Sequence, residues 1–291
     1  MDDPAFVERD VFEALREPRP IVGTWGGLWV CGSLEGLRQP TVAVVGTRAA
    51  TLYGRRLATQ FATELGQAGC CVLSGLALGI DSAAHQGALA AGTPTIGVLG
   101  SGHRRFFPPR NVGLAERMLT GGGAVVSPFA PEERANPWQF LARNSIVAGL
   151  SDAVVVIEAP ARSGALNTAG WAAGHIPVLA VPGDVDRPHV AGCHALLRDG
   201  AILARNAADV LEALGLNAAG ARDPRLNLVP AIDDPLQRAI LERLGCGNAD
   251  LGALIAATGA GVAAVTAALS ILEIHGAIQS ADGGEYATVV R

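Results

Sequence analysis

The feature that most constrains the fold is an alternation of short apolar runs with longer helical patterns between residues 41 and 215. The runs are rich in Val and Ile and apolar on both faces, which is typical of strands in a parallel sheet that helices cover on both sides. Helical patterns lie between them, at 54–68 and 79–91 for example. This alternation predicts an α/β fold with a Rossmann-like, doubly wound, mostly parallel sheet. We expect strands at 41–46, 70–74, 94–99, 124–127, 153–158 and 176–181.

The predicted sheet lies in a core domain at 41–216, and residues 1–40 form an N-terminal lead-in of weak pattern. Trp25 and Trp29 stand four residues apart among glycines, which favours a hairpin or short strand over a helix in the lead-in.

A second, smaller domain is predicted at 233–291. Residues 217–232 contain Gly, Pro, Asn and Asp without periodicity, as linkers do. Three helices and a two-stranded hairpin follow, which together make a winged helix. The helices are expected at 235–244, 249–258 and 262–275, and the hairpin strands at 277–281 and 285–290.

Composition excludes several classes of protein. The 291-residue chain has no Lys, so it holds neither a phosphate-binding loop ending in Gly-Lys-Ser/Thr nor a lysine Schiff base. No apolar run reaches the ~18 residues that cross a bilayer, and the charged first residues hold no signal-peptide core. Five Cys without a CxxC pair favour a reduced compartment. We therefore expect a cytoplasmic protein with no membrane contact.

The charge of the chain is unevenly distributed. The net charge is −5, but residues 41–165 hold ten Arg against seven acidic residues. Residues 230–291 hold three Arg against seven acidic residues. The central region can therefore bind a polyanion although the whole chain is acidic.

Residues that suit anion binding follow the predicted strands. In a doubly wound sheet, ligands bind beyond the carboxyl ends of the strands. Glycines let backbone N–H groups approach an anion, and helix N-termini favour negative charge. No segment carries the complete GxGxxG dinucleotide fingerprint, so this rim predicts phosphate contacts without a nucleotide-specific pocket. The candidates are Gly46, Thr47 and Arg48 after the first strand, Ser74 and Gly75 after the second, and Ser163, Gly164 and Thr168 after the fifth.

Arg48 has two interpretations, an anion contact or an ion pair with a carboxylate such as Asp81; we favour the anion contact. Asp81 and His85 lie four residues apart on a predicted helix. They are interpreted either as an acid–base pair, as a pair of metal ligands, or as an Asp that orients a structural His. We favour the structural interpretation. The other His residues lack HxxxH or HExxH spacing, so we expect no metal site.

Phe106 and Phe107 lie between two groups of Arg, in a chain with few aromatic residues. Aromatic side chains beside cations suit single-stranded nucleic acid, where bases stack and phosphates take the charge. The alternative is that one Phe packs under its loop. The remaining candidates for DNA contact in this loop are Arg104, Arg105 and Arg110.

With these motifs assembled, the chain resembles the bacterial DNA-processing protein A family (DprA, also called Smf) from about residue 35 to 215. The motifs that carry the resemblance are VAVVGTRAATLYG (42–54), SGLALGIDSAAHQGAL (74–89), FPPRN (107–111), RNSIVAGLSDAVVVIEAPARSGALNTA (143–169) and PGD with GCHALLRDGA (182–201).

The resemblance implies a homodimer that binds single-stranded DNA and loads the RecA recombinase during natural transformation, in the presence of single-strand-binding protein. It implies no catalytic residue and no cofactor. Mapped by motif, it adds Arg143 and Asn144 to the expected DNA contacts, beside Arg48 and the second loop, and places Phe107 where the family commonly has Tyr.

Some positions depart from the family pattern. Leu78 and Ser145 stand where positive charges are frequent, and Pro128 stands where Glu is frequent. Where the family has a late GxN motif, this chain has Gly192-Cys193-His194. Fewer cations predict weaker phosphate binding with a shallower salt dependence.

The winged-helix domain also departs from a DNA-reading one. Between Arg243 and Arg291 there is no other basic Arg or Lys, and the presumed recognition helix is mainly apolar. Major-groove readers need donors and cations there. We expect this domain to pack against protein.

Two enzymatic alternatives remain. A nucleotide phosphoribohydrolase of the cytokinin-activating type uses a similar sheet and a Glu within PGGxGTxxE, but residues 161–168 contain no Glu. A dinucleotide-dependent oxidoreductase would need the fingerprint and a ribose-binding acid after the second strand. Both fit less well than a non-enzymatic DNA-binding protein.

Overall fold

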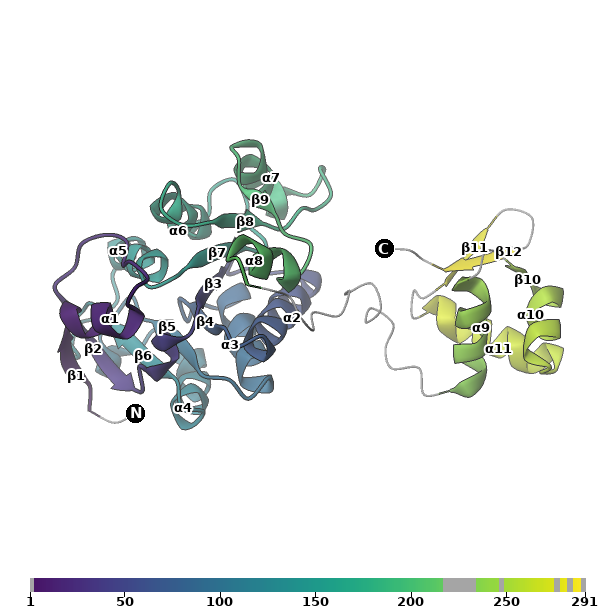
Figure 1. Ribbon diagram of the computed structural model, residues 1–291, viewed down its shortest axis with the longest axis horizontal. Helices are drawn as coiled ribbons and strands as arrows, with labels where there is room; N and C mark the ends of the chain where they lie inside the picture. Colours follow the sequence, from purple (N-terminus) through teal and green to yellow (C-terminus); the bar gives the residue numbers. More distant parts are fainter. Residues whose placement is uncertain (1–2, 217–233, 246–248, 275–277, 282–284, 289–291) are drawn as a thin grey trace. The chain divides into compact units, whose positions relative to one another are not determined.

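The computed structural model describes residues 3–216, 234–245, 249–274, 278–281 and 285–288. The chain divides into two compact units, Met1–Ala221 and Arg222–Arg291, which are coloured along the sequence in Figure 1.

The first unit is built on a nine-stranded sheet of order β1-β2-β6-β5-β4-β3-β7-β8-β9. All pairings from β6 to β9 are parallel, whereas β1–β2 and β2–β6 are antiparallel. The mostly parallel, doubly wound sheet is therefore confirmed. Its strands are β1 (Ala5–Glu8), β2 (Gly27–Gly32), β3 (Thr41–Val45), β4 (Cys71–Ser74), β5 (Thr95–Val98), β6 (Ala124–Ser127), β7 (Ala153–Val156), β8 (Val178–Ala180) and β9 (Ile202–Leu203).

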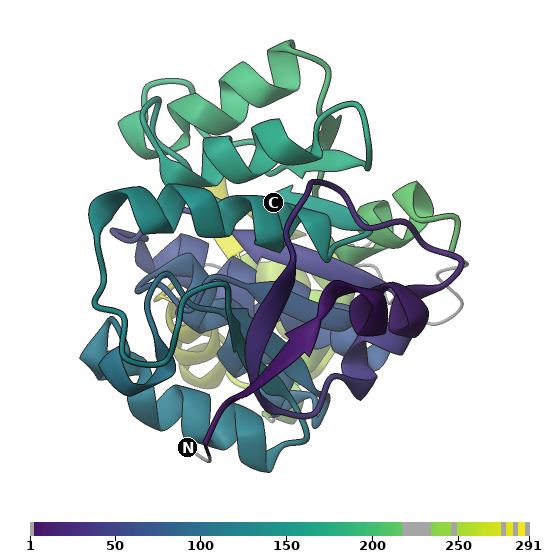
Figure 2. The same ribbon diagram turned by 90° about the vertical axis from the view of Figure 1, so that its left-hand side faces the viewer.

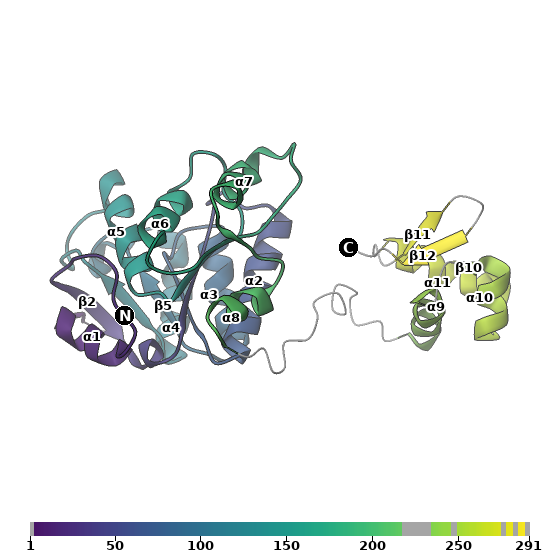
Figure 3. The same ribbon diagram turned by 45° about the horizontal axis from the view of Figure 1, so that its top comes forward.

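Helices cover both faces of this sheet (Figure 3). In β3, Val42 and Val44 pack in one apolar cluster and Ala43 and Val45 in another, because successive side chains of a strand point to opposite faces. This double burial explains why the strands are apolar throughout. The helices are α1 (Arg9–Arg16), α2 (Leu52–Gln67), α3 (Ile80–Ala90), α4 (Val112–Thr120), α5 (Pro137–Gly149), α6 (Gly164–Ala172), α7 (Ala191–Arg198) and α8 (Ala207–Ala213).

The N-terminal segment is integrated into the sheet, where β1 and β2 form the edge visible in Figure 2. Trp29 lies in β2, as expected, but α1 between the two strands was not predicted. The buried Arg16 of α1 contacts Asp152 through an ion pair of 2.6 Å and donates to Leu150 O at 2.6 Å. A helix this short is fixed by such long-range contacts and not by its own periodicity.

The second unit contains the expected three helices and hairpin strands, but Ala249–Asp250, expected at the start of the second helix, form a third strand. Leu254, Val265, Leu269 and Leu272 form the centre of its own apolar core. The predicted linker at 217–232 and the hairpin turn lie outside the described residues. The elements are α9 (Pro235–Gly245), β10 (Ala249–Asp250), α10 (Leu251–Thr258), α11 (Val262–Ile274), β11 (Ile278–Ala281) and β12 (Glu285–Thr288), with sheet order β10-β12-β11.

No single helix in the described ranges is long and apolar enough to cross a membrane. The pair α10 and α11 passes that test of length and composition only when joined across a bend of 110°.

Candidate functional site

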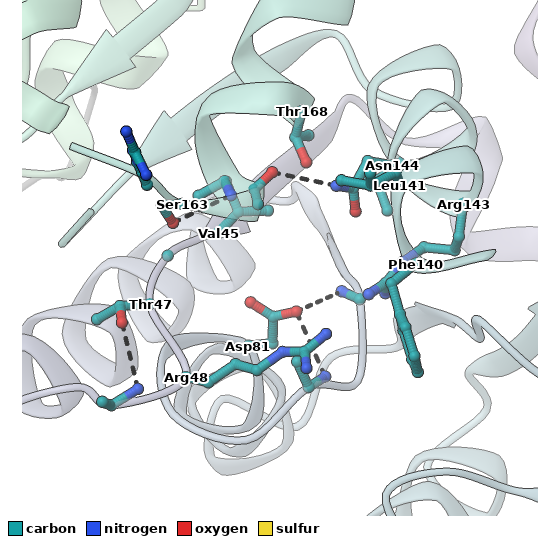
Figure 4. A pocket seen from close by; sticks show the side chains of 18 of the residues that line it. Val45, Thr47, Arg48, Asp81, Phe140, Leu141, Arg143, Asn144, Ser163 and Thr168 are labelled. Atoms are coloured by element: carbon teal, nitrogen blue, oxygen red, sulfur yellow. Dashed lines mark hydrogen bonds between the residues drawn. The ribbon is translucent and has the colours of Figure 1, made fainter. Parts of the chain in front are cut away.

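A pocket of about 640 Å³ lies where the carboxyl ends of β3, β4 and β7 meet α5 and the N-terminal part of α6 (Figure 4). It brings together most of the rim residues that the sequence predicted. Those that line it are Gly46, Thr47, Arg48, Gly75, Phe107, Arg143, Asn144, Ser163, Gly164 and Thr168.

The loop after β3 presents Arg48 to solvent. The Arg48 guanidinium carbon lies 4.9 Å from the ring centroid of Phe140, which is a cation–π distance. No carboxylate among the described residues forms an ion pair with Arg48, so the intramolecular pair with Asp81 is not found. Thr47 stabilises the loop because its Oγ1 accepts a hydrogen bond from Ala49 N at 3.2 Å. Arg48 is therefore available to a ligand.

The loop after β4 differs from the expectation. Asp81 Oδ2 accepts hydrogen bonds from Gly75 N at 3.1 Å and Ala77 N at 3.4 Å, so these N–H groups are not free to hold a phosphate. Ser74 is fully buried and its Oγ donates to Val44 O at 2.7 Å. The structure does not favour Ser74 or the Gly75 N–H group as direct phosphate contacts, because a strand carbonyl and an internal carboxylate already bond them.

His85 is a structural residue, as the favoured interpretation had it, but Thr95 and not Asp81 orients it. His85 Nδ1 lies 2.8 Å from Thr95 Oγ1, and the ring is completely buried. Burial lowers the pKa of His85 to about 3, and the nearby positive charge of Arg143 acts in the same direction. His85 is therefore a neutral core residue.

Arg143 of α5 is buried beside Asp81. Its Nη1 donates to Val98 O at 2.6 Å, and burial lowers its pKa to about 10, although the charge of Asp81 opposes this. Burial in turn raises the pKa of Asp81, and Arg143 acts against that shift. A Cβ on Gly75 would lie 1.8 Å from Nη1 of Arg143. An alanine at position 75 would therefore force the buried guanidinium of Arg143 to move from its bond to Val98 O.

The opposite wall of the pocket is the N-terminus of α6. Asn144 Nδ2 donates to Gly164 O at 3.1 Å, and Ser163 Oγ accepts from Ala165 N at 3.3 Å. Gly164 is exposed, with no atom closer than 3.8 Å to the position of a Cβ. Arg162 lines the pocket next to it and forms no ion pair with any described residue. The first turn of a helix carries unpaired N–H groups, so this wall favours an anion.

The loop after β5 contributes less than predicted. Arg104 pairs with Asp3 at 2.8 Å and Glu132 at 3.0 Å, and Arg105 lies 3.5 Å from Glu132. Neither they nor Arg110 line the pocket. Backbone hydrogen bonds explain the position of Arg104 and Arg105. Gly102 N and Arg104 N donate to carbonyls in the segment 131–133, which hold this part of the loop outside the pocket.

The two phenylalanines of that loop have different environments. Phe106 is half-buried against an apolar cluster that includes Leu76, Leu99 and Met118, so it is not placed to stack on a base. Phe107 is 42% exposed, lines the pocket, and has its ring centroid 5.7 Å from that of Phe140. Of the two, Phe107 is the candidate for stacking.

Sequence reasoning missed Phe140 and the position of Asp81, and it did not select Arg162. Arg162 stands beside two selected residues, so the rim argument could have found it. Phe140 lies one helical turn before Asn144, which was the available signal. Within the described ranges, no group of three or more His, Cys, Asp or Glu could hold a metal ion.

Residues 21–215 match the family model of DNA recombination-mediator protein A, and residues 224–284 match the DprA winged helix domain. A putative DNA processing protein DprA of Mycobacterium tuberculosis is 38% identical over 262 residues, which are 88% of this chain and 67% of that protein. Protein Smf of Escherichia coli is 41% identical over 190 residues, which cover 65% of this chain and 51% of that protein.

Two solved structures share the fold. DprA from Streptococcus pneumoniae superposes with a TM-score of 0.61 at 39% identity, covering 64% of this chain and 66% of that chain. DprA from Helicobacter pylori, described for its single-stranded DNA binding mode, gives 0.61 at 27% identity and covers 72% and 95%. The chain thus spans between about half and two thirds of the curated relatives described above.

Proposed function

The chain belongs to the DNA recombination-mediator protein A family, and from that premise we propose that its pocket binds single-stranded DNA. A structural relative, the Helicobacter pylori protein, is described as binding single-stranded DNA. Beyond the family, the proposal depends on the chemistry of the pocket itself.

The observation that carries the proposal is the exposed, unpaired Arg48 stacked on Phe140 at the edge of the sheet. A guanidinium without a carboxylate partner is suited to a phosphate, which it can contact through two parallel hydrogen bonds. Phe107 adds an exposed ring beside it. Cations and aromatic faces in one groove are the combination that binds single strands irrespective of sequence.

The residues have four roles in this mechanism. Arg48, Arg162 and the N-terminus of α6 hold successive phosphates, and Phe107 stacks on a base. Asn144 fixes the start of α6 through its bond to Gly164 O, so it positions a contact. Arg143 shapes the floor, because its charge is balanced by Asp81 and one of its donors is bonded within the protein.

We also propose a role in recombination, which is based on the family to which the chain belongs. In this proposal the protein is a homodimer that binds incoming single strands during natural transformation. It loads the RecA recombinase on them in the presence of single-strand-binding protein. Two pockets in one dimer would add their contacts through effective concentration. No catalytic role is proposed; the phosphoribohydrolase alternative is not favoured, since residues 161–168 at this wall contain no Glu.

The test is a fluorescence-anisotropy titration of a labelled strand of ~20–35 nucleotides, compared with a duplex of equal length, at two salt concentrations. We expect a preference for the single strand and a fall in affinity with salt of roughly 0.7 log units per neutralised phosphate for each tenfold increase. Equal affinity for the duplex would contradict the proposal. Recombinase assembly on strands coated with single-strand-binding protein, with and without this protein, tests the mediator activity.

A further inference from the structure

Asp81 is a buried carboxylate at the floor of the pocket with one oxygen unused. Its side chain is 6% exposed, and Oδ2 accepts both loop hydrogen bonds, from Gly75 N and Ala77 N. Oδ1 has no hydrogen-bond partner in the part of the chain that the structure describes. Figure 4 shows the carboxyl group directed into the pocket, close to Arg48 and Arg143. Oδ1 is not among the enclosed polar atoms of the described residues that lack a partner, so it is open to the pocket, where a donor on a ligand can reach it.

The chemistry of a DNA strand limits what that donor is. Phosphates and chain-internal deoxyriboses offer acceptors only, so the donors of a strand are the N–H groups of its bases. A phosphate cannot bond to Oδ1, because both groups offer only acceptor oxygens. A free cation is disfavoured as well, because Arg48 and Arg143 already surround Asp81 with positive charge. A base is therefore the part of the strand that suits this end of the pocket.

We propose that Oδ1 of Asp81 accepts a hydrogen bond from the Watson–Crick edge of a base, such as N3–H of thymine, and that this bond makes the pocket select single strands. In a duplex the same N–H is occupied by the complementary base, so the bond is available only when the base is unpaired. The inference rests on the proposed binding of single-stranded DNA and adds to it the residue that reads the unpaired state.

The surroundings of Asp81 are suited to this role. The two loop N–H groups fix Oδ2, so the direction of Oδ1 is set before a ligand enters. Arg143 is held in place by Val98 O, and its charge lowers the pKa of Asp81 against the larger rise that burial causes. Two of the proposed phosphate contacts, Arg162 and the start of α6, lie at the other wall, whereas the third, Arg48, lies close to Asp81. A base bonded to Asp81 would therefore lie beside the phosphate that Arg48 holds.

The experiment compares three single strands of ~20 nucleotides by anisotropy on the full chain: oligo(dT), the same strand made of N3-methylthymidine, and an abasic strand. Methylation removes the one N–H donor of thymine but keeps every phosphate. For the wild-type protein we expect the methylated strand to bind at least about tenfold more weakly, as the loss of a hydrogen bond to a charged group requires.

The variant Asp81→Asn is designed to remove this discrimination. Its amide oxygen would remain with the N–H groups of Gly75 and Ala77, so its NH₂ would face the pocket where the acceptor was. The affinity of this variant for oligo(dT) is then expected to be as low as its affinity for the methylated strand. Its affinity for the abasic strand should be no lower than that of the wild-type protein. Asp199→Asn removes the same charge at an exposed position outside the pocket lining and should keep the tenfold difference.

Three results would overturn the inference. The wild-type protein binds oligo(dT) and its methylated form equally; the methylation penalty persists in Asp81→Asn; or the variant binds all strands more tightly by one factor, which would make Asp81 only a repelling charge. If Asp81→Asn fails to fold, judged by circular dichroism, the wild-type comparison still decides. Absence of binding to every strand would instead refute the proposed function.

Discussion

Replacement of Arg48 by Ala isolates one phosphate contact with little effect on the fold. The guanidinium is exposed, and its contact within the protein is the stack on Phe140 at 4.9 Å. An exposed cation–π contact is worth about 0.5–1 kcal/mol, so we expect the free energy of unfolding to fall by no more than about 1 kcal/mol. Binding should change more, because a hydrogen bond to a charged group contributes about 1.5–3 kcal/mol. The dissociation constant for a single strand should therefore rise about 10- to 150-fold.

The matched control is Arg104→Ala. It removes the same charge from a residue that the sequence also predicted as a DNA contact. Arg104 lies outside the pocket and is paired with Asp3 and Glu132. Exposed ion pairs contribute little, so its removal should leave affinity within about twofold.

The assay is anisotropy over a series of salt concentrations. For Arg48→Ala, the slope of log affinity against log salt should become less negative by about 0.7, because one fewer phosphate is neutralised. The Arg104→Ala slope should match that of the wild type. Equal losses in the two variants would refute the reasoning, since they would show that net charge, and not the position of the guanidinium, governs binding.

Three further predictions concern stability and the second unit. Gly75→Ala should lower the free energy of unfolding by about 1–3 kcal/mol in chemical denaturation, because its Cβ would collide with Arg143; Gly164→Ala, where the space is open, should change it little. His85 has a folded-state pKa of about 3 against an ordinary 6.5, so between these two pH values only the unfolded chain binds this proton. The contribution of His85 to the free energy of unfolding is therefore fully present above pH 6.5. It falls as the pH drops below that value, by at most about 1.4 kcal/mol per pH unit. His85→Gln should reduce that slope, and an unchanged slope would exclude this residue as its source. The fragment 230–291 should show no tight duplex binding at ~0.15 M salt in a gel-shift titration, and tight binding would contradict the predicted protein-facing role of the winged helix.

Local sequence patterns determined most of the fold. The strand predicted at 124–127 has those bounds in the structure, and the helix predicted at 79–91 forms at Ile80–Ala90. Strands buried on both faces give continuous apolar runs, which are visible without any knowledge of tertiary contacts. The short helix α1 escaped this reasoning, because its stability comes from Arg16 and the distant Asp152.

The site was predictable as a rim and not as a set of contacts. Parallel strands end at one edge of the sheet, so the residues that follow them gather there whatever the details, and Arg48, Ser163 and Gly164 were found for that reason. The sequence does not show which of these groups are already bonded within the protein.

Tertiary structure decided that question through competition between internal and external partners. Glu132 lies within ion-pair distance of Arg104 and Arg105, and the floor carboxylate Asp81 took the N–H groups after β4. Arg48 forms no ion pair with a described carboxylate, although its charge lowers the pKa of the nearby Asp81, so its exposed guanidinium remains available to a ligand. Residue type and strand order fix which groups gather at the edge, whereas availability depends on distances between residues far apart in the chain, and only the packed fold sets those distances.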